Sequence, residues 1–160
     1  MSALHGAARE GDAEKVKKLI AEGAEVDATD HIKRTALHLA AFAGHADCIQ
    51  ALIEAPCDVK LCAVDDTNAL HFAAQKGHLQ ACRRLINAGL GVNGRNRKGA
   101  TALILAAQNG HAELVQFLLQ RKANPAATNK AGKTAHDVAK TAEIRKILTE
   151  HLMLVYVLKL

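Results

Sequence analysis

The chain has 160 residues, of which 49% are hydrophobic and only 2% aromatic, and its formal net charge is +5. This length suits one domain with a core of Ala, Leu, Ile and Val, and the scarcity of aromatic residues argues against a large ligand pocket or a base-stacking platform for nucleic acid. The four cysteines occur without a signal-peptide pattern at the N-terminus, so we expect reduced thiols in a cytoplasmic or nuclear protein.

One short pattern returns along the chain at a constant interval of 33 residues. In its fullest form it reads Thr-Ala-Leu-His-Leu-Ala-Ala, and its copies lie at residues 3–8, 35–41, 68–74, 101–107 and, weakened, 134–139. A fixed interval of this kind is typical of stacked arrays, in which each unit has an apolar face that only its neighbours can cover. The sequence therefore predicts an all-α solenoid in a single domain, residues 1–160.

Each copy predicts two antiparallel helices. In the second copy Thr35 is a good N-cap, residues 36–43 form the first helix, and Gly44 ends it in the left-handed conformation. The second helix covers about residues 46–54, where apolar residues stand at helical spacing: Ile49, Leu52 and Ile53. Because the other copies repeat this arrangement, we expect all helices to have regular length.

A turn follows in every unit, at residues 30–34, 63–67, 96–100 and 129–133. Such a turn needs a residue with a positive φ angle, which Gly99 and Gly132 supply without strain. Lys33 and Asp66 stand at the same position in the other two turns. Asp tolerates this conformation, whereas Lys33 is expected to be mildly strained.

Together these features resemble the ankyrin repeat family. The resemblance covers residues 1 to about 150 and rests on the Thr-x-Leu-His-x-Ala-Ala pattern, a Gly-His pair in three copies, and the Leu-Leu or Leu-Ile pair of the second helix. The proline usual after the capping residue is alanine in every copy, which costs some preorganisation and leaves the fold unchanged. The resemblance implies helix-turn-helix units joined by β-turn or hairpin loops, with caps at about 1–29 and 129–150 and full units at 30–62, 63–95 and 96–128.

The end of the chain departs from the repeat. Residues 152–158 are apolar on every side of a helix, and seven residues cannot span a bilayer. Three interpretations remain open: the last helix continues and packs over the edge of the fourth unit, the apolar tail (residues 151–160) binds a partner or a second copy, or it is foreign to the domain.

We expect no catalytic residues, no metal site and no cofactor. Six of the nine histidines recur at two positions of the unit, which indicates a structural role, and the one serine, Ser2, lies at the fraying terminus. Cys48 and Cys82 take the places of Leu114 and Val115 in the fourth copy, which predicts buried thiols. The family resemblance also makes Asn93 and Asp27 candidate sites for the oxygen-dependent asparaginyl hydroxylase that modifies such domains.

The resemblance further implies a protein-binding module whose concave face is formed by the turns and the ends of the first helices. On family geometry this face contains His31, Ile32, Arg34, Phe42, Val64, Asp65, Gln75, Lys76, Arg95, Arg97, Lys98, Asn109, Lys130 and Lys133. Residues 1–80 carry 8 basic and 12 acidic groups, and residues 81–160 carry 13 basic and 4 acidic groups, so the predicted stack is a dipole.

An apolar patch of Ile32, Phe42 and Val64 therefore adjoins a basic stretch, which predicts an acidic partner segment with an apolar anchor. We expect no small-molecule substrate and no membrane partner. Two alternatives are a stoichiometric inhibitor of a kinase or other enzyme and, less favoured, a nucleic-acid binder that uses the basic half. The ankyrin-type inhibitors of cyclin-dependent kinases share a shortened first helix in their second unit, which this sequence does not predict.

Overall fold

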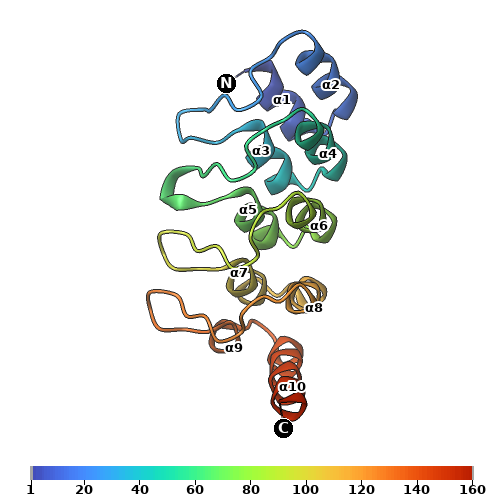
Figure 1. Ribbon diagram of the computed structural model, residues 1–160. Coiled ribbons are helices and arrows are strands. Elements are labelled where there is room, and N and C mark those ends of the chain that lie inside the picture. The colour runs from blue at the N-terminus through green and yellow to red at the C-terminus, as the bar shows by residue number, and fades with distance from the viewer. Residues whose placement is uncertain (1, 160) are drawn as a thin grey trace.

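Ten α-helices stack in pairs in the computed structural model, which describes residues 2–159. In the inner column lie α1 (Ala3–Glu10), α3 (Ala36–Ala43), α5 (Ala69–Lys76), α7 (Ala102–Gln108) and α9 (Ala135–Val138); in the outer column lie α2 (Ala13–Ala21), α4 (Ala46–Glu54), α6 (Leu79–Asn87), α8 (Ala112–Gln120) and α10 (Ala142–Leu158). Figure 1 shows the two columns side by side, with the loops between successive pairs projecting to the left, away from the outer helices. The predicted all-α solenoid is confirmed.

The core runs along the whole stack because each helix packs on its counterparts in the neighbouring pairs. Inner helices approach closely through alanines that are completely buried, among them Ala40, Ala73 and Ala106. Leu52, Leu85 and Leu118 of the outer column are also completely buried. Burial of each such leucine stabilises the fold by roughly 1.5 to 3 kcal/mol. The core is therefore continuous through the stack.

The recurring histidines connect neighbouring units. His38 sits in a capping box with Thr35, whose backbone N–H donates to Nδ1 of the imidazole, while Nε2 donates to the carbonyl of Leu61 at 2.9 Å. His71 repeats this arrangement with the carbonyl of Gly94 at 2.9 Å. A second set, at the start of the outer helices, bonds to the preceding unit; His78, for example, contacts the carbonyl of Phe42 at 3.1 Å. The structural interpretation of these six histidines is confirmed.

The predicted positive φ angle is found at Lys33, and the turn of the next unit has two residues with a positive φ angle. Lys33 has a φ angle of 62°, and Asp66, at the corresponding position, has 56°. Asp65 also has a positive φ angle, 60°, within the short 3₁₀ turn η1 (Val64–Asp66). Within residues 2–159, this is the only loop whose turn forms a 3₁₀ helix.

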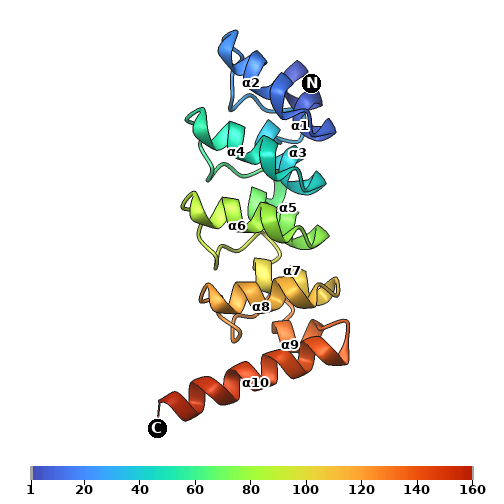
Figure 2. The same cartoon turned by 90° about the vertical axis from the view of Figure 1, so that its right-hand side faces the viewer.

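The last pair of helices corrects the expectation of regular length, since α9 has 4 residues and α10 has 17. α9 ends early because Lys140 stands where the other copies place a buried alanine such as Ala107, and an ammonium group is not buried there. α10 then begins at the N-cap Thr141. Figure 2 shows that α10 runs past the end of α8 and slopes away from the stack.

The predicted continuation of the last helix is confirmed, but its predicted packing holds only for the first half. Ile144 and Leu148 are buried against the end of the stack. Leu152, Met153 and Leu154 are exposed, as are Tyr156, Val157 and Leu158, with exposed fractions from 46% to 79%. The apolar turns after His151 therefore lie outside the core.

Candidate functional site

The four connecting loops and the ends of the inner helices form one surface, which we call the loop face. Its loops are residues 22–35, 55–68, 88–101 and 121–134. Ten predicted site residues lie in these loops: His31, Ile32, Arg34, Val64, Asp65, Arg95, Arg97, Lys98, Lys130 and Lys133. The other four lie at or just after the ends of α3, α5 and α7: Phe42, Gln75, Lys76 and Asn109.

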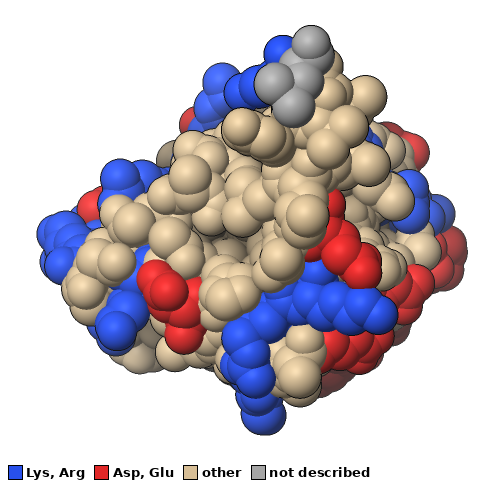
Figure 3. All heavy atoms as spheres, turned by 90° about the horizontal axis from the view of Figure 1, so that it is seen from below, with Lys and Arg blue, Asp and Glu red and all other residues tan. Residues whose placement is uncertain are grey.

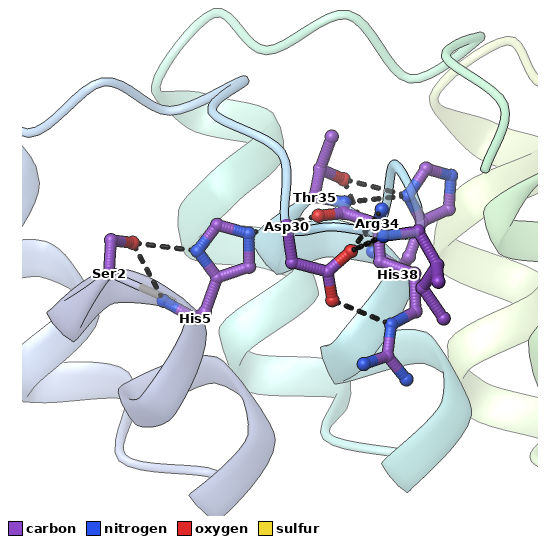
Figure 4. Close-up of polar contacts among 7 residues, drawn as sticks. Ser2, His5, Asp30, Arg34, Thr35 and His38 are labelled. Carbon is purple, nitrogen blue, oxygen red and sulfur yellow. Dashed lines mark hydrogen bonds and ion pairs between the residues drawn. The ribbon is translucent and has the colours of Figure 1, made fainter.

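An acidic or amide side chain at the first residue of the turn fixes the shape of three of these loops. Asp30 Oδ1 accepts hydrogen bonds from the backbone N–H of Ile32 at 3.0 Å and of Arg34 at 2.8 Å (Figure 4). Asn96 and Asn129 make the equivalent pairs of bonds in their loops. This role was not predicted from the sequence, although Asp30, Asn96 and Asn129 follow the 33-residue interval. Ala63 stands at the remaining position, and its loop is the one that forms the 3₁₀ turn.

Asp30 also fixes the side chain of Arg34. Its Oδ2 accepts a hydrogen bond from Nε of Arg34 at 2.8 Å, and the Asp30 side chain is only 1% exposed (Figure 4). Burial opposes ionisation of this carboxyl group, but the donors of Arg34 and Ile32 outweigh burial and lower the pKa of Asp30 to about 2. The predicted site residue Arg34 therefore serves the loop's own structure.

Phe42 is the most informative aromatic residue of the loop face. It lies at the end of α3 with an exposed fraction of 43%, and its ring meets that of Phe72 edge-on at 6.1 Å between centroids. The ammonium group of Lys76 lies 4.8 Å from the centroid of the Phe42 ring. Phe72 was not predicted as a site residue, because it occupies the variable place between His and Ala-Ala in the repeated pattern. The anchor is thus an aromatic pair with a cation beside it.

Two members of the predicted apolar patch, Ile32 and Val64, meet at the loop tips. The carbonyl of Ile32 accepts a hydrogen bond from the backbone N–H of Val64 at 3.2 Å, which joins the tips of two loops. Val64 is 43% exposed there, whereas Ile32 is half-buried. The third member, Phe42, lies at the end of α3 beside Phe72 and Lys76.

Two arginines of the predicted basic stretch have partners within the molecule. Arg97 lies 3.2 Å from a carboxylate oxygen of Asp65 and 3.9 Å from one of Asp66. Arg95 donates to the carbonyl of Gly99 at 3.2 Å and to that of Thr128. Both side chains thus also connect neighbouring loops, and their role in partner binding stays a prediction.

Three lysines of the same stretch remain available. Lys98, Lys130 and Lys133 are exposed and form no ion pair with any described carboxylate. The backbone N–H of Lys130 donates to the carbonyl of Lys98 at 3.0 Å, so these two lysines stand on adjacent loop tips. The positive charge of the loop face is therefore concentrated at its third and fourth loops.

A groove of about 410 Å³ lies between the inner helices and the loops at the third and fourth pairs. Its lining includes four predicted site residues: Asp65, Gln75, Lys98 and Asn109. Leu105 supplies an apolar floor, and Asn96 and Gln108 add polar groups. The groove thus brings together residues of α5, α7 and the loops, and it includes Lys98, one of the three free lysines.

The two hydroxylation candidates bridge neighbouring units on the other side of the loops. Asn93 Oδ1 accepts from the backbone N–H of Asn124 at 2.8 Å. Both carboxylate oxygens of Asp27 lie 3.1 Å from the backbone nitrogen of Asp58, which is the same arrangement two units earlier. These bonds give each side chain a structural role, and hydroxylation of either residue stays a prediction.

The buried cysteines carry unreactive thiols. Cys48 and Cys82 are completely buried, as predicted, and burial raises the pKa of the Cys82 thiol to about 12. Within residues 2–159 no three side chains of His, Cys, Asp or Glu come together in a way that could hold a metal ion. None of the described helices has the length and apolar composition needed to cross a membrane.

Comparison with known families decides the classification. A family model of ankyrin repeats in three copies matches residues 4–93, 53–129 and 70–152, which together cover most of the chain. The protein belongs to the ankyrin repeat family. Ankyrin repeats are generally protein–protein interaction modules. Stacked repeats create extended concave surfaces, which such proteins use for binding. None of the curated proteins compared with this ankyrin repeat protein matches it.

Proposed function

We propose that this ankyrin repeat protein binds an extended acidic segment of another protein on its loop face, without catalysing a reaction. The observation that carries the proposal is the exposed Phe42, held between Phe72 and Lys76 on a face that the fold itself does not cover. An aromatic side chain at the centre of an otherwise polar surface is typical of residues that dominate binding energy.

The segment's apolar residue would cover Phe42 and Phe72, and its following residues would enter the groove beyond Lys76. Carboxylates of the segment would then meet Lys98 and Lys130, which have no intramolecular ion pair among the described residues. These exposed lysines contribute mainly to association, because screened surface charges add little affinity each. The free thiols support the proposal of a cytoplasmic or nuclear location.

Peptide selection tests the proposal for any partner segment of this chemistry. A displayed library of random peptides is panned against the protein and against Phe42→Ala. We expect enriched peptides with several acidic residues and one or two large apolar residues, and weakened binding of these peptides to the variant. Basic peptides, or peptides that bind both proteins equally, would contradict the proposal.

A structural feature bears on the first alternative, and a titration tests the second. An inhibitor of a kinase or other enzyme needs no acidic segment, and α3, the first helix of the second unit, has 8 residues and is not shortened. A nucleic-acid binder predicts a steep salt dependence with RNA. Titration of RNA and of a selected acidic peptide over a range of salt concentrations separates nucleic-acid binding from the proposed function.

A further inference from the structure

The C-terminal turns of α10 are apolar around their whole circumference. We use the name apolar overhang for residues 152–159, in which Leu152, Met153, Leu154, Tyr156, Val157 and Leu158 are all exposed. Successive residues of a helix point about 100° apart, so these six side chains together with the half-buried Val155 point in every direction around the axis. A groove on a protein partner would cover only one side of such a helix.

The surroundings of the apolar overhang are basic. Residues 141–159 carry three basic side chains, Arg145, Lys146 and Lys159, against two acidic ones, Glu143 and Glu150. Lys146 lies 3.9 Å from Glu150, and Arg145 donates to the carbonyl of Ala139 at 3.0 Å. Figure 3, which views this end of the stack, shows uncharged side chains over much of the surface, with Lys and Arg as well as Asp and Glu side chains among and around them.

These observations favour one kind of partner over a second copy of the chain. Pairing two copies through α10 would bring together two halves of the same positive sign, since residues 81–160 carry 13 basic and 4 acidic groups. A lipid surface surrounds an inserted helix on all sides, and anionic headgroups attract nearby Lys and Arg. We propose that the apolar overhang inserts peripherally into an anionic lipid surface and holds the loop face near that surface.

The dimensions of the overhang suit this role. The seven helical residues 152–158 extend about 10 Å, which is less than half of a bilayer's hydrocarbon thickness of about 30 Å. Tyr156 is suited to the level of the headgroups, and the long side chain of Lys159 can place its ammonium group there as well. The expectation of no membrane partner rested on the length needed to span a bilayer, which peripheral insertion does not require.

The sequence provides its own probe, because Tyr156 is the only tyrosine and there is no tryptophan. Tyrosine fluorescence therefore reports on the overhang, and quenching by acrylamide measures the exposure of Tyr156. The protein is mixed with vesicles of phosphatidylcholine alone or with added phosphatidylserine, and binding is followed in parallel by co-sedimentation. We expect quenching to fall and protein to sediment with the anionic vesicles, and both effects to be much weaker with neutral vesicles.

Variants assign the effect to its residues. Leu154→Asp with Val157→Asp should abolish vesicle binding while leaving the melting temperature within a few degrees, since both side chains are exposed. Lys159→Gln should weaken binding to anionic vesicles about fivefold. Phe42→Ala is the matched control from the loop face and should bind vesicles as the parent protein does.

Three results would overturn the proposal: no binding to anionic vesicles, equal binding to both kinds of vesicle, or retained binding by the double aspartate variant. Shielding of Tyr156 without vesicles, rising with protein concentration together with a doubled mass in light scattering, would assign the overhang to self-association instead. None of these results depends on whether the loop face binds a peptide.

Discussion

At the residue scale, His38 and His71 make the stability of the stack depend on pH. Burial lowers the pKa of both imidazoles, and hydrogen bonds to the carbonyls of Leu61 and Gly94 offset this only in part. In each ring Nδ1 accepts a backbone N–H and Nε2 donates, so the neutral form is the one that fits. Protonation would place two donors face to face in a buried site.

The unfolded chain therefore binds more protons than the folded protein below the ordinary histidine pKa of 6.5. Stability should be fully present above that pH and should be lost progressively as the pH falls below it. Urea denaturation at about pH 7.5 and about pH 5 checks this, and the double variant His38→Gln, His71→Gln should lose much of the difference. An unchanged pH dependence in that variant would show that other groups cause it.

Gly44 lies where two neighbouring units approach each other closely. Its φ angle is 80°, and a Cβ atom added there would lie 2.5 Å from Nδ1 of His78. Gly23 has a similar φ angle, 92°, but open space around it. Gly23→Ala should therefore cost about 1 kcal/mol from backbone strain alone. Gly44→Ala should cost at least about 2 kcal/mol more, because the ring of His78 must move.

Chemical denaturation of the two glycine variants measures both costs under the same conditions. Equal losses of unfolding free energy would mean that the His78 contact does not constrain the junction between units.

At the element scale, α10 combines a structural half with an exposed half. Leu148 is 1% exposed and Leu154 is 61% exposed. Leu148→Ala should reduce the free energy of unfolding by about 2 to 5 kcal/mol, whereas Leu154→Ala should change it by less than about 0.5 kcal/mol. Thermal or urea denaturation of these two variants provides the comparison. A large loss in Leu154→Ala would place the overhang in the core after all.

The same helix shows what could be predicted from sequence and what could not. The 33-residue interval, the capping residues and the glycines predicted eight of the ten helices closely, because one unit repeats nearly unchanged. The early end of α9 had a sequence signal in Lys140, which replaces a buried alanine. The exposed state of residues 152–158 had none, because an apolar run does not indicate what covers it.

The residues of the candidate site were named from the sequence, but their contacts were not predicted. Arg95 and Arg97 count as basic residues in the sequence, yet their guanidinium groups bind a neighbouring loop's carbonyl or carboxylates. Such pairing depends on side-chain geometry between units, which spacing along the chain does not determine. Phe72 was not predicted as a site residue, because its place in the repeated pattern was treated as variable.

At the scale of the whole molecule, stability should be lowest at the two ends of the stack. Terminal pairs contact one neighbour instead of two; α2 buries only Val16, and α9 has 4 residues. Amide hydrogen exchange should therefore be faster in α1, α2 and α9 than in the inner helices α3, α5 and α7. Uniform protection along the chain would indicate that the stack opens only as one unit.

We propose that the loop face binds the partner. Hydrogen exchange of a peptide complex tests this proposal. A peptide from the proposed selection is added at saturation, and protection is compared with that of the free protein. We expect slower exchange in the loops around residues 64–67 and 96–99 and at the ends of α3 and α5, with α4, α6 and α8 unchanged. New protection confined to α4, α6 and α8 would contradict the claim, because the partner would then bind the outer helices.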